Sequence, residues 1–274
     1  RLTDVTGVQT CALPISDLFA GDQLVLTGRY LGERPITFEI SGNYLGKERT
    51  FRYTFGLEKA STQNSFVPRL WATRQIAVLI SAIRELGADR IASETDISHR
   101  DPSLKELVDE VVRLSTEFGI LTEYTAFLAR EGTDLTRPER VLQEARQNFI
   151  DRAWNRRSGI SSVNQERNSQ EFMSQKHAAG RNRYWDERMN RVEISQVQQV
   201  QDLSFYHRAG KWVDSRIVDR TPIPDRTILF GSPEFWELAA RLAEQGRQGC
   251  IALSHDVLLF LDGKVVLIKT VSKK

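Results

Sequence analysis

Three consecutive residues near the C-terminus, Ser254, His255 and Asp256, are of the types that form a hydrolase triad. In a triad the nucleophile, the base and the orienting acid converge from separate segments of the chain. Consecutive residues of an extended segment point to opposite sides, and no Gly-x-Ser-x-Gly turn accompanies these three. We interpret them as a polar turn between strands. The alternative is a small hydrolase-like or ligand-binding domain with its site near His207, His255 and Asp256.

A second pattern, Asp96-Ile97-Ser98, matches the first half of D-x-S-x-S. That motif holds a divalent cation through carboxylate and hydroxyl oxygens. The second serine is replaced by Arg100, which places a cation where a metal ligand is required. A loop that caps a helix is therefore the preferred interpretation.

No other pattern points to an active site. The remaining histidines (His99, His177 and His207) lack a metal-ligand spacing such as H-E-x-x-H. The sequence contains neither a Walker A loop nor G-x-G-x-x-G, and the acidic pairs at 109–110 and 186–187 lie on polar faces, where carboxylates are usually solvated. We predict no catalytic, cofactor-binding or metal-binding residue and no enzyme activity.

The composition is that of a globular protein of about two domains: 274 residues, 40% apolar and 27% charged. A net charge of +2 is too small to favour nucleic acid or an anionic membrane as the main partner. No run of apolar residues is long enough to span a bilayer.

Residues 5–15 are the in-frame translation of a widely used short-read sequencing adapter. We therefore interpret residues 1–15 as an adapter artefact, expect them to be disordered, and exclude them from the fold. One of the two cysteines, Cys11, belongs to this stretch. The other, Cys250, lies among apolar residues, where a lone cysteine is usually a small core residue.

Residues 16–60 are expected to form a three-stranded β-meander, the remnant of a β-sandwich. Phe38 and Ile40 alternate with polar residues, as do Phe51, Tyr53 and Phe55. Glycines at 32, 42 and 46 mark the turns. Three strands with one apolar face need a covering layer, and we expect a missing upstream domain to provide it, so that the chain alone would expose this face.

Residues 61–154 are expected to be helical. The first helix is capped at Asn64 or Ser65 and ends at Gly87, and the second runs from Asp101 to a C-cap at Gly119. A short extended stretch at 124–129 follows. A third helix opens with a capping-box pattern, Thr136 to Glu139.

Residues 155–201 are rich in Gln, Asn, Ser and Arg and poor in large apolar residues. We interpret this stretch as a linker that is partly disordered and helical at best in part. Its mixed charge favours a solvated spacer. Nucleic-acid binding through its arginines is the second alternative.

Residues 202–274 are expected to form a small α+β module. Two hairpins are predicted, one at 208–211 and one at Asp262-Gly263 between two apolar runs. A helix begins at Ser232-Pro233 and ends near Gly246.

Several stretches together resemble the C-terminal part of bacterial VIT/von Willebrand factor type A (VWA) proteins, which are related to inter-alpha-trypsin inhibitor heavy chains. The similar stretches are residues 17–30, 66–72, 107–126, 205–214 and 257–268. At 119–126 the chain reads Gly-Ile-Leu-Thr-Glu-Tyr-Thr-Ala, where the family has Gly-Ile-Val-Thr-Pro-Tyr-Thr-Ser. Glu123 thus stands in place of proline, and Ala126 in place of serine.

The resemblance implies upstream VIT and A domains, with a D-x-S-x-S site for a divalent cation in the A domain and none in this chain. It also implies protein partners, including those upstream domains, and an extracytoplasmic or cell-envelope location. We therefore expect an α+β chain that is a non-enzymatic structural and interaction region, involved in adhesion or protein–protein interaction. No nucleic acid, no cofactor and no membrane span are expected.

Overall fold

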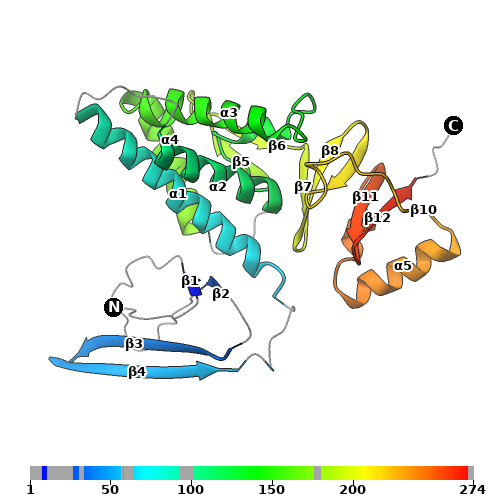
Figure 1. Cartoon of the computed structure of the whole chain (residues 1–274), viewed down its shortest axis with the longest axis horizontal. Coiled ribbons are helices and arrows are strands. Elements are labelled where there is room, and N and C mark those ends of the chain that lie inside the picture. The colour runs from blue at the N-terminus through cyan, green and yellow to red at the C-terminus, as the bar shows by residue number, and fades with distance from the viewer. Residues whose placement is uncertain are drawn as a thin grey trace. The chain divides into compact units, whose positions relative to one another are not determined.

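A computed structural model of the chain describes residues 8–10, 27–30, 34–56, 58, 64–92, 101–175 and 180–270. The chain divides into two compact units, Arg1–Val67 and Pro68–Lys274. The described residues form helices together with antiparallel and mixed sheets, so the predicted α+β class is confirmed (Figure 1). None of the helices in the described ranges is both long and apolar enough to cross a membrane.

The first unit contains two two-stranded sheets. Strand β1 (Val8–Thr10) pairs with β2 (Gly28–Tyr30), and β3 (Ile36–Tyr44) pairs with β4 (Lys47–Phe55). Among the described residues β2 pairs with β1 and not with β3, so the predicted three-stranded meander does not form there. Residues 23–26, also assigned to the meander, lie outside the described residues. The alternation of apolar residues predicts strands but does not choose their partners. Of residues 1–15, for which disorder is expected, the structure describes 8–10, which form β1; the others lie outside the described residues.

The turn between β3 and β4 consists of Leu45 and Gly46, with φ of 53° and 76°. Positive φ at both central residues is typical of the two-residue type I′ turn, whose twist matches that of the flanking strands. This turn fixes a register of nine directly opposed pairs, from Ile36↔Phe55 to Tyr44↔Lys47.

Helices form one layer of the second unit. They are α1 (Val67–Ala92), α2 (Pro102–Phe118), the 3-10 helix η2 (Ala126–Ala129), α3 (Pro138–Phe149), the π-helix η3 (Ile150–Trp154) and α4 (Gly159–Ser174). The predicted caps of α2 are confirmed, since the Asp101 carboxylate accepts from two backbone N–H groups and Gly119 is left-handed.

Two local predictions in this layer are wrong. The stretch expected to be extended at 124–129 contains η2. The capping box does not form, because the Thr136 hydroxyl donates to Asp134 Oδ1 (2.6 Å). The N-cap of α3 is Arg137, which makes no side-chain cap hydrogen bond. An Asx-type turn competes for the same hydroxyl.

The linker predicted at 155–201 is wrong as well. Most of it is structured as α4, β5 (Asn182–Trp185), β6 (Arg191–Ile194) and β7 (Val197–Val200). In this region buried amide side chains stabilise the packing of the elements, as apolar side chains do in other parts of the chain. Asn168 donates to the Trp185 carbonyl (2.9 Å) and accepts from its N–H (2.7 Å), and Gln165 donates to three backbone carbonyls.

The C-terminal part contains a six-stranded sheet in the order β10-β12-β11-β9-β8-β7. The new strands are β8 (Leu203–Arg208), β9 (Lys211–Asp214), β10 (Arg226–Leu229), β11 (Asp256–Leu261) and β12 (Lys264–Lys269). Both predicted hairpins are present. Helix α5 (Pro233–Glu244) and the 3-10 helix η4 (Gln248–Ile251) pack on the sheet over a core that includes Phe205, Trp212, Leu242, Cys250 and Leu259.

This sheet is tied directly to the helices. Tyr206 donates its hydroxyl to the Ser115 carbonyl of α2 (3.1 Å), and Gln199 donates to the Phe118 carbonyl (2.7 Å). The Arg208 guanidinium donates to the Ala129 carbonyl at the end of η2 (3.0 Å). Side chains of the sheet therefore donate hydrogen bonds to backbone carbonyls of the helical layer, so the sheet and helices of the second unit are in direct contact.

Candidate functional site

The β3–β4 hairpin carries an apolar face built from both strands. Directly opposed residues lie on the same face, so the pairs Ile36↔Phe55, Phe38↔Tyr53 and Ile40↔Phe51 gather six apolar side chains. Phe38 and Phe55 are in edge-to-face contact, with ring centroids 5.7 Å apart. Phe51, Tyr53 and Phe55 are 50%, 50% and 56% exposed, so no layer of described residues fully covers this face.

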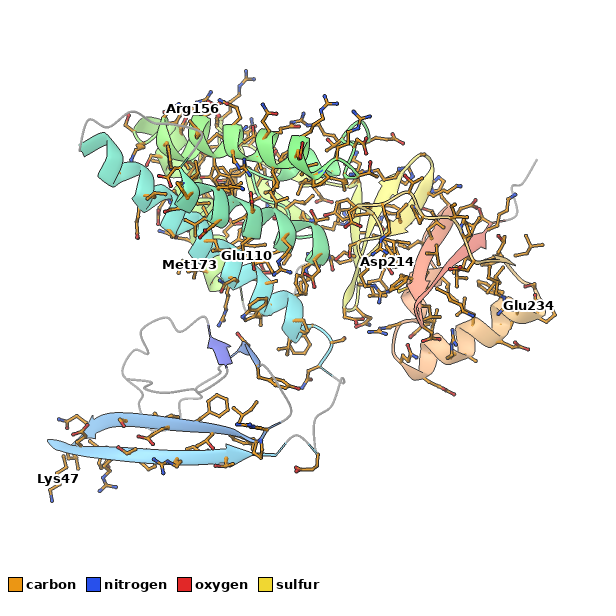
Figure 2. All side chains as sticks on the ribbon, in the orientation of Figure 1. Lys47, Glu110, Arg156, Met173, Asp214 and Glu234 are labelled. Atoms are coloured by element: carbon orange, nitrogen blue, oxygen red, sulfur yellow. The ribbon has the colours of Figure 1, made fainter. Side chains whose placement is uncertain are left out.

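The opposite face of the same hairpin is polar and internally paired. Thr37 contacts Thr54 through their hydroxyls (3.0 Å), and Ser41 contacts Thr50 in the same way (2.9 Å). The Arg52 guanidinium donates to Glu39 Oε2. Each of these pairs is also solvent-exposed, so this face is compatible with water, whereas the apolar face is not. Figure 2 shows side chains on both faces, with Lys47 at the tip.

The residues of the hydrolase alternative are brought together only in part. The imidazoles of His207 and His255 lie at 5.4 Å between centroids, and His207 also contacts the Trp212 ring. The Asp256 carboxylate, however, accepts from the Thr270 N–H and hydroxyl (2.9 Å each). Within the described residues neither imidazole is hydrogen-bonded to Asp256. The contact that orients the base in a triad is therefore not made.

The remaining sequence candidates give no site either. Residues 96–100 and His177 lie outside the described residues. No three His, Cys, Asp or Glu residues of the described ranges cluster in a way that could hold a metal ion. Cys250 is buried, and burial raises the pKa of its thiol to about 12, which suits a core residue and not a nucleophile.

Five of the seven arginines of residues 155–201 pair with acids of the same region. Arg156 pairs with Glu187, and both Arg181 and Arg183 pair with Glu193. The guanidinium of Arg167 lies 3.7 Å from the Trp185 ring centroid. A phosphate-binding surface needs guanidinium groups that are free to contact phosphates, and these groups are already engaged.

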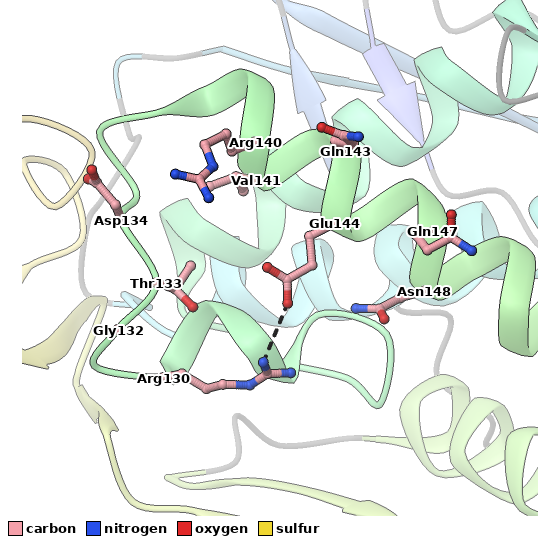
Figure 3. Close-up of a pocket in the computed structure, with 10 residues that line it drawn as sticks. All are labelled: Arg130, Gly132, Thr133, Asp134, Arg140, Val141, Gln143, Glu144, Gln147 and Asn148. Atoms are coloured by element: carbon pink, nitrogen blue, oxygen red, sulfur yellow. Dashed lines mark ion pairs between the residues drawn. The ribbon is translucent and has the colours of Figure 1, made fainter.

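A cavity of about 700 Å³ lies between the 130–134 segment and α3. Figure 3 shows the residues that line it. Charges of both signs line it, including Arg140, Asp134 and an Arg130–Glu144 ion pair at 3.5 Å. The pKa of Asp134 is lowered, chiefly by hydrogen bonds from Thr136. The polar lining of this cavity is largely exposed, and mixed charge on an exposed face is usually solvated.

A second cavity, of about 370 Å³, has a buried acid in its wall. Glu123 is 6% exposed, and its Oε1 accepts no hydrogen bond from any described residue. From the sequence alone, Glu123 is notable only because it replaces the proline of the family pattern. The sequence nevertheless contains a signal for a buried acid, because Glu123 lies between Thr122 and Tyr124 in a stretch that is otherwise uncharged.

The apolar face of the β3–β4 hairpin is thus the strongest candidate functional surface, and the Glu123 cavity is an independent second feature. Both lie on secondary structure whose register or packing is fixed by hydrogen bonds. Comparison of the chain with protein-family models, with curated proteins and with solved structures finds no match.

Proposed function

We propose that this chain is a non-enzymatic interaction region of a VIT/VWA-type protein at the cell envelope, acting in adhesion or protein–protein interaction. Its β3–β4 hairpin packs its apolar face against a β-sheet of a VIT or A-type domain. The observation that carries the proposal is the division of the hairpin into an apolar face and a polar, internally paired face.

The hairpin favours a sheet as its partner. Two strands alone are marginally stable in water, and they become stable when a hydrophobic face is covered. Alternating aromatic and β-branched side chains on one face are typical of the inner layer of a sandwich, where two sheets pack about 10 Å apart. The three exposed aromatic rings of β4 supply the large contact area on which interfaces depend.

The use of this face is tested with two matched double variants of the full chain. Phe51→Thr with Phe55→Thr removes two exposed rings and keeps β-branched residues in the strand. Thr50→Val with Thr54→Val alters the opposite face at neighbouring positions. We expect the unmodified chain to bind an apolar-surface dye, the ring variant to bind much less, and the control to bind at least as much. Equal dye binding by the ring variant and the unmodified chain would contradict the proposal.

The family part of the proposal has its own test. Sequencing the source DNA across the Ser16 codon with long reads should reveal an open frame that continues into a domain with D-x-S-x-S. That domain would carry the divalent-cation site, because the similar stretch of this chain, Asp96-Ile97-Ser98, has Arg100 in place of the second serine. A start codon directly upstream of Arg1 would refute the adapter interpretation of residues 1–15 and the expected upstream domains, and would leave the interaction surface to be judged on the variants alone.

A further inference from the structure

The cavity beside Glu123 lies among η2, α3, η3 and the β5–β6 hairpin, all within the second unit. Apolar side chains of Phe127 and Ile194 form part of its lining, together with Tyr184. At about 370 Å³ it falls in the size range of small-molecule pockets. Such pockets combine apolar walls with a few polar groups that orient the ligand.

Glu123 is held in the cavity wall by the turn that contains it. The Thr122 N–H donates to the Thr125 hydroxyl (3.0 Å). The Tyr124 hydroxyl donates to Gln165 Oε1 (2.7 Å), and its ring stacks on Phe149 at 4.4 Å. Both neighbours of Glu123 are therefore anchored. The acid is buried and its carboxylate interacts with Asn168, but Oε1 accepts no hydrogen bond from any described residue, which is costly for a polar group unless a partner arrives.

Arg152 lines the same cavity with the opposite charge. Within the described parts of the chain its guanidinium forms no ion pair and donates no hydrogen bond, and it does not reach the Glu123 carboxylate. Because guanidinium groups that are half-buried usually have acceptors, this group is the natural counterpart of the unused oxygen.

The other charged residues of the cavity wall already have partners. Glu193 pairs with Arg181 and Arg183, and Arg130 pairs with Glu144. Glu131 accepts from the Ala209 N–H (3.1 Å). Of the charged side chains in this wall, Glu123 and Arg152 are left with unused hydrogen-bonding capacity and with opposite formal charges.

We propose that this cavity binds a free α-amino acid with an aliphatic side chain. Its carboxylate pairs with Arg152, its ammonium pairs with Glu123, and its side chain contacts the apolar wall. Guanidinium and carboxylate are geometrically matched for two parallel hydrogen bonds. A ligand with only one of the two charges would satisfy one protein group and leave the other unpaired.

Binding is expected to depend on pH. Burial raises the pKa of Glu123 to about 7, although interactions with Asn168, Arg152 and Arg84 oppose the shift. An ammonium group beside the carboxylate favours its charged form. Binding therefore releases a proton near and below pH 7 and strengthens as pH rises through that range.

The test is calorimetric titration of the full chain with L-leucine, isocaproate and isoamylamine. The last two are leucine without its ammonium group and leucine without its carboxylate. We expect leucine to bind at least about tenfold more tightly than either, as the loss of one partner of a charge pair predicts. No binding of leucine, or equal binding of leucine and isocaproate, would overturn the proposal.

Variants locate the site. Glu123→Gln keeps side-chain size, and Arg152→Gln removes the charge and leaves a shorter polar side chain. Each variant should weaken leucine binding by about tenfold or more. Arg140→Gln, in the cavity of Figure 3, is the control and should leave binding unchanged. Thermal unfolding of each variant verifies that it is folded. Leucine binding that survives both Glu123→Gln and Arg152→Gln in folded protein would place the ligand elsewhere and refute the assignment.

Discussion

The indole ring of Trp154 lies directly against the backbone of Gly87 in the C-terminal part of α1. A Cβ atom added at Gly87 would be 2.2 Å from Trp154 Cδ1, and Trp154 Nε1 donates to the Ile83 carbonyl one turn earlier (2.8 Å). The glycine that the sequence predicts as the end of this helix is therefore inside it, since α1 continues to Ala92. Gly87 serves close packing rather than termination.

Gly87→Ala should destabilise the protein even though alanine is the better helix former. Helix propensity alone predicts a gain of about 1 kcal/mol. The added methyl group must displace the indole and its hydrogen bond, and overpacking of this kind costs about 1–3 kcal/mol. Urea unfolding should show a net loss of stability. Gly132→Ala, where an added Cβ meets nothing within 4 Å, should stay within about 0.5 kcal/mol of the unmodified protein. A more stable Gly87→Ala variant would show that the indole moves freely.

Gly119→Ala should cost more than Gly210→Ala. Both glycines have positive φ, 57° and 73°, so each substitution carries a backbone cost of roughly 1–2 kcal/mol. At Gly119 an added Cβ would also be 2.7 Å from Gln199 and from Ser204, whereas Gly210 faces open space. The difference between the two unfolding free energies isolates the packing of α2 against the sheet. Equal losses of unfolding free energy in the two variants would mean that the contact between Gly119 and the sheet adjusts to the added methyl group without cost.

The buried Glu123 should make stability fall as pH rises. Its folded pKa, about 7, is above the ordinary value of 4.5, so the folded state binds the proton more tightly than the unfolded state does. Stability is therefore lost between about pH 4.5 and 7, by up to about 3 kcal/mol. Urea unfolding at pH 5 and pH 8 measures this loss. Glu123→Gln should remove most of the difference and be the more stable protein at pH 8. An identical pH dependence in both proteins would contradict the buried position of the acid.

Cys250 should not react with a thiol reagent in the folded protein. Burial and the nearby Asp214 and Asp202 raise the pKa of its thiol, so almost no thiolate is present at neutral pH. The measurement uses a Cys11→Ser background, so that a single thiol is counted. The expected result is slow labelling in buffer and complete labelling in concentrated urea. Rapid labelling in buffer would mean that the core beneath α5 opens readily.

The regular parts of the fold could be predicted from the sequence because local signals agree there. Asp101 and Gly119 bound α2 as expected, and Asp262-Gly263 joins two strands as expected. In these places capping and turn chemistry act within a few residues of sequence. The pairing of β2 could not be predicted in this way, because strand partners are chosen across long stretches of chain.

The stretch taken for a linker shows a different reason for failure. Composition rules treat Asn and Gln as solvated, but Asn164, Gln165 and Asn168 are buried. Their amides satisfy backbone groups far away in sequence, such as those of Trp185. The same reason applies to Glu123 and Arg152, which share one cavity although they are separated in sequence. Tertiary packing brings such groups together, and the periodicity of apolar residues in the sequence does not predict these contacts.

The central claim is that the apolar face of the β3–β4 hairpin is an interaction surface. Sedimentation velocity of the full chain across a range of concentrations tests it most directly. We expect concentration-dependent self-association of the unmodified chain, which Phe51→Thr with Phe55→Thr abolishes and Thr50→Val with Thr54→Val does not. A single monomeric species at every concentration, for the unmodified chain as well as for both variants, would contradict it.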